Sequence, residues 1–185
     1  MKKLHPVLED VLAKYARLTD LKARALRLEG GAEKAPSGLG FLTLVASNVA
    51  TGEILQVAHG MNIVVNTGRS GLAHLLAGDD VNTHKVTTMR FGDGTGSPTV
   101  ANNALFGAQI IDKAVAVGFP DGNAGLKVSF SATVGASEGN GGGTQVYQEV
   151  ALMKGNGVDF FSHKVSGSIS KDNTIVLTAV YTFVF

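Results

Sequence analysis

The stretch MNIVVNTGRSGLAHLLAGDDVNTHKVTTMRFGDGTGSP, residues 61–98, decides the fold of this chain. After an apolar strand-like run, Leu72, Leu75 and Leu76 follow at the i, i+3, i+4 spacing of one helical face. Gly78 ends this short helix, and a second strand-like run comes next. We therefore predict a strand–helix–strand unit that caps one end of a β-domain, with the three leucines buried beneath it.

The second strand runs into a glycine-rich segment with Gly92, Gly94 and Gly96. A dinucleotide-binding loop needs its third glycine at position 97, directly before a helix. The chain has Ser97 there, followed by Pro98. We therefore predict a tight structural turn, which glycine favours because it tolerates positive φ.

The rest of the chain beyond residue 38 alternates apolar and polar residues at the period of two that is typical of strands. Turn residues recur about every 8–12 positions, which favours an antiparallel sandwich over βαβ units. We predict a mainly β fold: an antiparallel β-sandwich of about eight strands, jelly-roll or immunoglobulin-like, with one short internal helix and a separate N-terminal amphipathic helix. The expected strands cover residues 39–49, 53–65 (with an irregularity at 59–60), 86–91, 109–117, 126–134, 145–153, 159–169 and 175–185.

Residues 1–29 form the expected N-terminal helix, residues 30–40 a glycine-rich tether, and residues 41–185 the β-sandwich domain. An apolar heptad with one lysine in its seam runs along the helix. Such a helix can lie on its own domain, dock on another protein or trimerise, and a flexible tether favours the last two. The predicted partner-binding residues are Leu4, Val7, Val11, Leu18, Leu21 and Leu28.

The last predicted strand is apolar on both faces and ends in aromatic residues. A strand of this kind should be central in its sheet or covered by another chain. From this strand and the heptad we predict a homo-oligomer, with a trimer favoured. The expected subunit contacts are Tyr181, Phe183 and Phe185.

Composition argues against several classes of protein. The chain has no cysteine, which removes disulfides, thiolate metal sites and cysteine nucleophiles. A net charge of +1 gives no argument for nucleic acid, and no run of about 18 apolar residues predicts a membrane span.

No catalytic, cofactor or metal constellation stands out. The five histidines are scattered without an i, i+4 pair, so we expect no metal site. His74 is expected on the surface of the short helix, and a histidine site shared between subunits on a trimer axis stays an alternative. A serine triad lacks its Gly-x-Ser-x-Gly elbow, and a carboxylate pair for glycoside hydrolysis cannot be assigned. We expect no enzymatic activity and no cofactor.

Over residues 51–185 the chain resembles small structural proteins of tailed-bacteriophage virions. The resemblance rests on the segments 62–68, 72–76, 91–95 with 98–99, 149–153, 161–165, Lys171 and 175–185. It implies a location in the virion after assembly in the host cytoplasm, with other virion proteins as partners and the host surface as a further candidate. It does not choose among tail-fibre, baseplate, neck and capsid-surface components.

The function expected from this resemblance is a non-enzymatic tail, baseplate or neck attachment module, anchored through the N-terminal helix. Two alternatives stay open. One is a capsid decoration protein on the head surface, and the other is a module that binds a host receptor or glycan.

Overall fold

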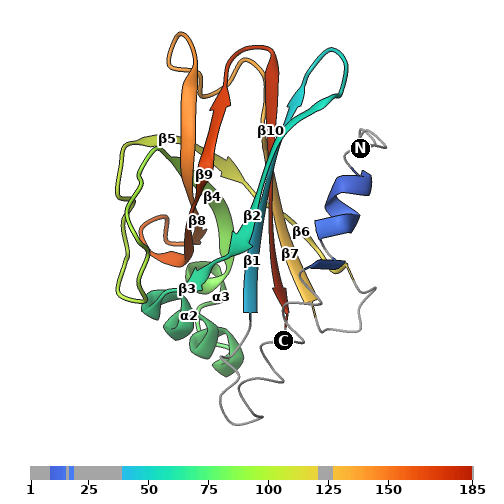
Figure 1. Ribbon diagram of the computed structural model, residues 1–185. Helices are drawn as coiled ribbons and strands as arrows, with labels where there is room; N and C mark the ends of the chain where they lie inside the picture. The colour runs from blue at the N-terminus through green and yellow to red at the C-terminus, as the bar shows by residue number, and fades with distance from the viewer. Residues whose placement is uncertain (1–8, 16, 19–38, 121–126, 185) are drawn as a thin grey trace.

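The computed structural model describes residues 9–15, 17–18, 39–120 and 127–184, and ten strands in this part of the chain form two antiparallel five-stranded sheets (Figure 1). This arrangement confirms the predicted antiparallel β-sandwich. The first sheet has the order β2-β1-β10-β7-β6 and the second β3-β9-β8-β4-β5. The strands are β1 (Leu39–Asn48), β2 (Ile54–Met61), β3 (Ile63–Val64), β4 (Val86–Gly92), β5 (Gln109–Ala114), β6 (Ala116–Gly118), β7 (Lys127–Val134), β8 (Gln145–Lys154), β9 (Phe160–Lys171) and β10 (Ile175–Val184).

Two of the predicted strands are each divided between the sheets, which raises the count above eight. The chain passes from β2 to β3 at Asn62, whose amide N–H donates to the carbonyl of Gly40 at 2.9 Å. It passes from β5 to β6 at Val115, whose N–H donates to Thr87 O at 3.1 Å. The strands β2 and β3 lie at one edge of their sheets, and β5 and β6 lie at the other edge. A continuous chain therefore bridges both edges of the sandwich.

The core lies between the two sheets, where inward-facing side chains of alternating residues meet. In β1, Leu42 and Leu44 face this core, while Phe41 and Thr43 face outward. Two aromatic rings, Phe91 and Tyr147, pack edge to face with centroids 5.9 Å apart. The other large core residues include Met89, Val150, Leu152, Ile169, Leu177, Tyr181 and Phe183.

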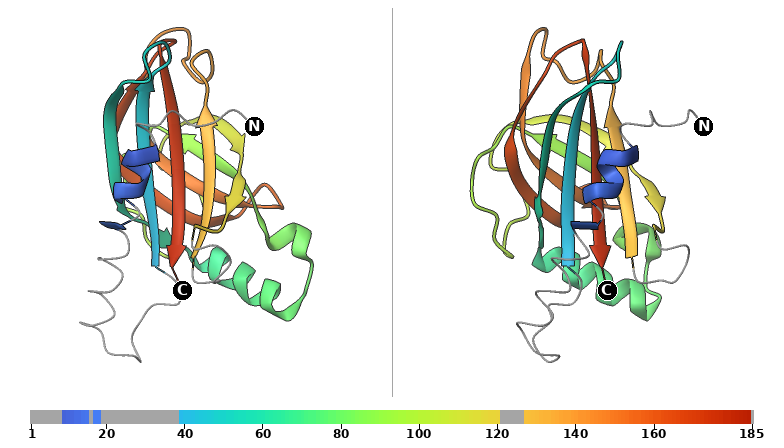
Figure 2. Two further views of the ribbon diagram at one scale, coloured as in Figure 1. Left: turned by 90° about the vertical axis from the view of Figure 1, so that its right-hand side faces the viewer. Right: turned by 45° about the vertical axis from the view of Figure 1, so that its right-hand side comes forward.

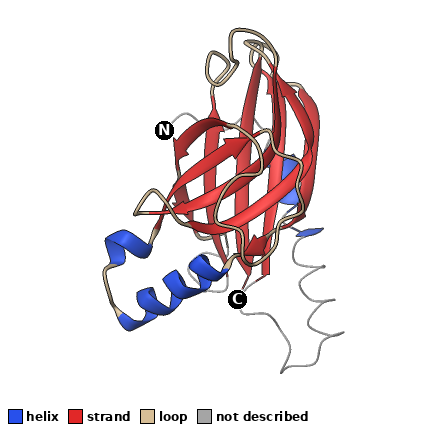
Figure 3. Ribbon diagram, turned by 90° about the vertical axis from the view of Figure 1, so that its left-hand side faces the viewer, coloured by secondary structure: helices blue, strands red, loops and turns tan. Residues whose placement is uncertain are grey.

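The predicted short helix exists as α2 (Asn66–Ala77), followed by the one-turn helix α3 (Val81–His84), and both lie at one end of the sandwich (Figure 3). The expected burial of three leucines is wrong. Leu72 packs partly against the core, Leu75 is half-buried, and Leu76 is 83% exposed.

Glycines form the buried side of α2. Gly68 and Gly71 are its buried residues, and a Cβ on Gly68 would collide with the carbonyl oxygen of Phe161. The helix therefore approaches β9 more closely than a leucine-lined face would allow.

A helical segment near the N-terminus, residues 9–15 and 17–18, crosses the outer face of the first sheet (Figure 2). The Tyr15 ring lies 4.8 Å from the ring of His59, which in turn stacks on Phe41 at 6.0 Å. The placement of this segment agrees with the alternative that the helix lies on its own domain. No helix among the described residues is long and apolar enough to cross a membrane.

Candidate functional site

The carboxylate of Glu149 on β8 is the centre of a buried polar network. It is 0% exposed and lies on the outward side of the second sheet, beneath residues 93–108. Oε1 accepts hydrogen bonds from the backbone N–H groups of Gly107 at 3.0 Å and Gly94 at 3.3 Å. Oε2 accepts one from Phe106 N–H at 3.0 Å. Glu149 therefore fixes both ends of this long loop onto the sheet.

The glycine-rich segment is shaped by this carboxylate. A Cβ on Gly92 would lie 2.8 Å from Glu149 Oε1, and a Cβ on Gly94 would lie 2.5 Å from the same atom. Asp93, between them, accepts a hydrogen bond from Ala108 N–H at 2.6 Å. The predicted tight turn is wrong, because residues 93–99 form no turn and none of Gly92, Gly94 and Gly96 has a positive φ. Gly92 and Gly94 instead let the backbone approach the buried carboxylate closely.

His163 on β9 completes the network. Its Nε2 lies 3.1 Å from Glu149 Oε2, and its ring lies between Phe106 and Phe160, with centroid distances of 5.2 and 5.3 Å. Within the described residues, His163 Nδ1 has no hydrogen-bond partner. This pattern fits a neutral imidazole that donates from Nε2 to the carboxylate.

Burial lowers the pKa of His163, although the hydrogen bond and charge of Glu149 act in the opposite direction. A carboxylate and a histidine in contact could in principle serve acid–base chemistry. Both side chains are 0% exposed, however, so a substrate has no access to either. This pair can hold a loop but cannot act on a soluble substrate in this conformation.

Lys171 forms a second buried polar node at the other end of the sandwich. Its side chain is 0% exposed, and Nζ donates to Glu138 O at 2.8 Å, Asn140 Oδ1 at 2.6 Å and Ala136 O at 3.1 Å. Burial lowers the pKa of Lys171. Lys171 is the last residue of β9, and its ammonium group organises the neighbouring loop, residues 136–140.

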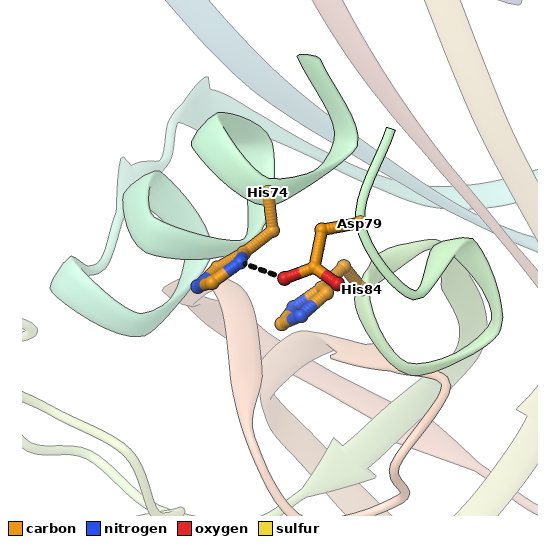
Figure 4. Close-up of side chains that lie close together, drawn as sticks. All are labelled: His74, Asp79 and His84. Carbon is orange, nitrogen blue, oxygen red and sulfur yellow. Dashed lines mark hydrogen bonds and ion pairs between the residues drawn. The ribbon is translucent and has the colours of Figure 1, made fainter. Parts of the chain in front are cut away.

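A third cluster joins α2 to α3 and is shown in Figure 4. His74 Nδ1 lies 2.8 Å from Asp79 Oδ2, and the His74 and His84 rings are stacked, with centroids 4.3 Å apart and planes 3° apart. One ligand atom from each of the three residues lies within 4.8 Å of the others. The prediction from sequence missed this cluster because its members are five residues apart, and the chain reversal at Gly78 brings them together.

The predicted partner-binding and subunit-contact residues have different outcomes. Val11 and Leu18 are half-buried in the helical segment, whereas Leu4, Val7, Leu21, Leu28 and Phe185 lie outside the described residues. Tyr181 and Phe183 are 0% and 2% exposed in the core, and the Tyr181 hydroxyl donates to Val150 O at 2.7 Å. Their assignment as subunit contacts is therefore corrected: the strand is central in its sheet, and both rings pack within their own chain.

Comparison of the chain with protein-family models, with curated proteins and with solved structures finds no match.

Proposed function

We propose that this chain is a non-enzymatic structural protein of a tailed-phage virion. In this role the sandwich is a rigid module, and residues 1–29 attach it to another virion protein at the tail, baseplate or neck. The proposal starts from the sequence resemblance, and the contacts made by the resembling segments support it.

The observation that carries the proposal is the complete burial and hydrogen bonding of the Glu149 carboxylate. The segment 149–153 and the glycine-rich segment 91–95 are both part of the resemblance, and in the structure they meet at this carboxylate. Three backbone N–H groups and one histidine satisfy it, and none of its surface is open to solvent. Residues whose types suit catalysis are thus committed to packing, as expected of a structural module.

Attachment through the N-terminal helix has a physical basis in the sheet beneath it. On the outer face of the first sheet, Phe41, Val45 and Val184 are 1%, 1% and 7% exposed. If the helix moved to a partner, this apolar face would need a new cover, because exposing it to water is unfavourable. We propose that the helix of a neighbouring chain can supply that cover, which couples attachment to assembly.

Support for a trimer rests on the heptad pattern, because Tyr181 and Phe183 are occupied in their own core. Sedimentation equilibrium of the full chain at micromolar concentration tests this part of the proposal. A trimer is expected. A monomer across the concentration range would contradict the assembly but leave the virion location to be tested separately.

The location is tested with an antibody raised against the purified chain. Immunogold labelling should decorate tailed particles released by cells that carry the encoding gene, at the tail, baseplate or neck. Labelling of the head would favour the capsid decoration alternative instead. An antigen that stays in the soluble fraction and never sediments with particles would contradict a virion role.

A further inference from the structure

The cluster of His74, Asp79 and His84 has the composition of a site for a transition metal. Two imidazoles and one carboxylate suit Zn²⁺ and neighbouring divalent metals, whereas Mg²⁺ and Ca²⁺ prefer oxygen ligands alone. The site is open to solvent, since the side chains of His74 and Asp79 are 44% and 63% exposed. An ion can therefore enter without unfolding of the sandwich.

The backbone holds the three residues together before any ion binds. Gly78 adopts a left-handed conformation with φ of 73°, and the N–H of Asp79 donates to His74 O at 2.9 Å. Asp80 caps α3, since its side chain accepts a hydrogen bond from Thr83 N–H. The carboxylate of the neighbouring Asp79 is turned to the cluster instead, with Oδ2 2.8 Å from His74 Nδ1.

His84 supplies a second observation that points to a ligand. Its Nδ1 is buried and, in the part of the chain that the structure describes, has no hydrogen-bond partner. Gly71 lies beside this ring, and a Cβ added there would be in ordinary van der Waals contact with His84 Nδ1, at 3.8 Å. Lys154, the cation whose stem packs against Gly71, is itself paired with Asp159 at 2.9 Å.

We propose that His74, Asp79 and His84 form a binding site for one Zn²⁺ ion, with water in the fourth coordination position. The three ligand atoms lie within 4.8 Å of one another. Small side-chain movements would therefore place each of them about 2.0–2.2 Å from one shared ion, which is the distance that zinc requires. The stacked rings cannot both direct a lone pair to one ion, so one ring turns about its Cβ–Cγ bond, a torsion with a broad energy minimum.

Zinc bound here would link the C-terminal turn of α2 to α3. The end of α3 is already tied to the sheet, because Gly155 N–H donates to Lys85 O at 2.8 Å. The ion would thus fasten the exposed helical unit to the end of β8. This inference does not depend on the virion role, because it rests on the geometry of the cluster alone.

The test is a titration of the full-length, tag-free chain with ZnCl₂ after treatment with EDTA and desalting. Isothermal calorimetry should give one Zn²⁺ per chain. Replacement of Zn²⁺ by Co²⁺ should give the visible absorption bands of a site with nitrogen and oxygen ligands. His74→Ala and His84→Ala should each weaken Zn²⁺ binding by more than about tenfold, while His59→Ala, which removes a histidine elsewhere, should leave it unchanged.

Circular dichroism of each variant checks that the sandwich is folded. Asp79→Asn serves as an additional variant, because its exposed side chain can change without disturbing the core, and it should also weaken binding. Absence of saturable Zn²⁺ binding by the wild-type chain would overturn the proposal. So would full binding by folded His74→Ala and Asp79→Asn, which would place the metal elsewhere.

Discussion

His163 Nε2 lies 3.1 Å from Glu149 Oε2, and both side chains are completely buried beneath the 93–108 loop. The pair joins β8 to β9 and, through the backbone N–H groups bound by Glu149, joins the loop to both strands. Breaking a buried, hydrogen-bonded charge leaves its partners unsatisfied, which costs more than the net contribution of an ordinary hydrogen bond.

Glu149→Gln should therefore destabilise the protein by about 2–4 kcal/mol. An amide retains one acceptor oxygen, but its NH₂ group would face N–H donors. Urea denaturation followed by circular dichroism measures the change. Glu53→Gln, in an exposed turn, is the matched control and should change stability by less than about 0.5 kcal/mol. If the two substitutions changed the free energy of unfolding equally, the Glu149 network would contribute no more to stability than an exposed side chain does.

Gly94→Ala tests the close approach of the backbone to this carboxylate. The new Cβ would lie 2.5 Å from Glu149 Oε1, so the loop or the strand must move. We expect a loss of about 1–3 kcal/mol, the usual range for overpacking. Gly143→Ala is the control, because a Cβ at that position meets no atom within 4 Å. A neutral Gly94→Ala substitution would mean that the loop is not held against Glu149.

His163 should make the stability of the protein depend on pH. The pKa of His163 in the folded chain is lowered from its ordinary value of 6.5 by burial. As the pH falls through 6.5, the unfolded chain takes up a proton that the folded chain does not, so the free energy of unfolding decreases. The urea midpoint should fall between pH 7 and pH 5, and less steeply in His163→Gln.

The pH dependence of stability caused by His163 falls in a different pH range from that caused by Asp159. Hydrogen bonds from Lys154, Asn156 and Asn103 lower the pKa of Asp159 from 3.8 to about 2. Its contribution to stability is present above pH 3.8 and is lost only as the pH falls toward 2. If the urea midpoint fell equally steeply between pH 7 and pH 5 in wild type and in His163→Gln, His163 would be excluded as the source of this pH dependence.

The leucines of α2 give a fourth prediction. Leu72→Ala should cost about 1–3 kcal/mol, because this side chain packs partly against the core. Leu76→Ala, on the same helix and 83% exposed, should change stability by less than about 0.5 kcal/mol. Thermal unfolding of both variants makes the comparison. A larger effect at Leu76 would contradict the glycine-faced packing of α2.

The sequence predicted the sandwich well because alternation along a half-buried strand is a local signal. In β7, Val128, Phe130 and Ala132 alternate with polar residues, and the structure pairs this strand with β10 over eight positions. The passages at Asn62 and Val115 escaped prediction, since a strand that changes sheets keeps its local pattern. Leu76 was misplaced because helical spacing defines an apolar face but not the depth at which it packs.

The polar features were harder to predict because they depend on long-range contacts. Glu149 meets Gly94 across 55 residues of sequence, and no local motif marks that pair. For His74, Asp79 and His84, the missing information was the direction of the chain after Gly78. In each case the sequence gives the residue types, but it does not give the residues that they contact in the folded chain.

The bridging of both sheet edges at Asn62 and Val115 has a consequence for how the molecule opens. A sandwich joined along one edge can swing apart, whereas here each sheet is covalently continuous with the other on both sides. Separation of the layers therefore requires loss of hydrogen bonds at both edges together. Amide hydrogens in β1 and in β8 should consequently exchange with deuterium through one global opening event, as a single cooperative unit.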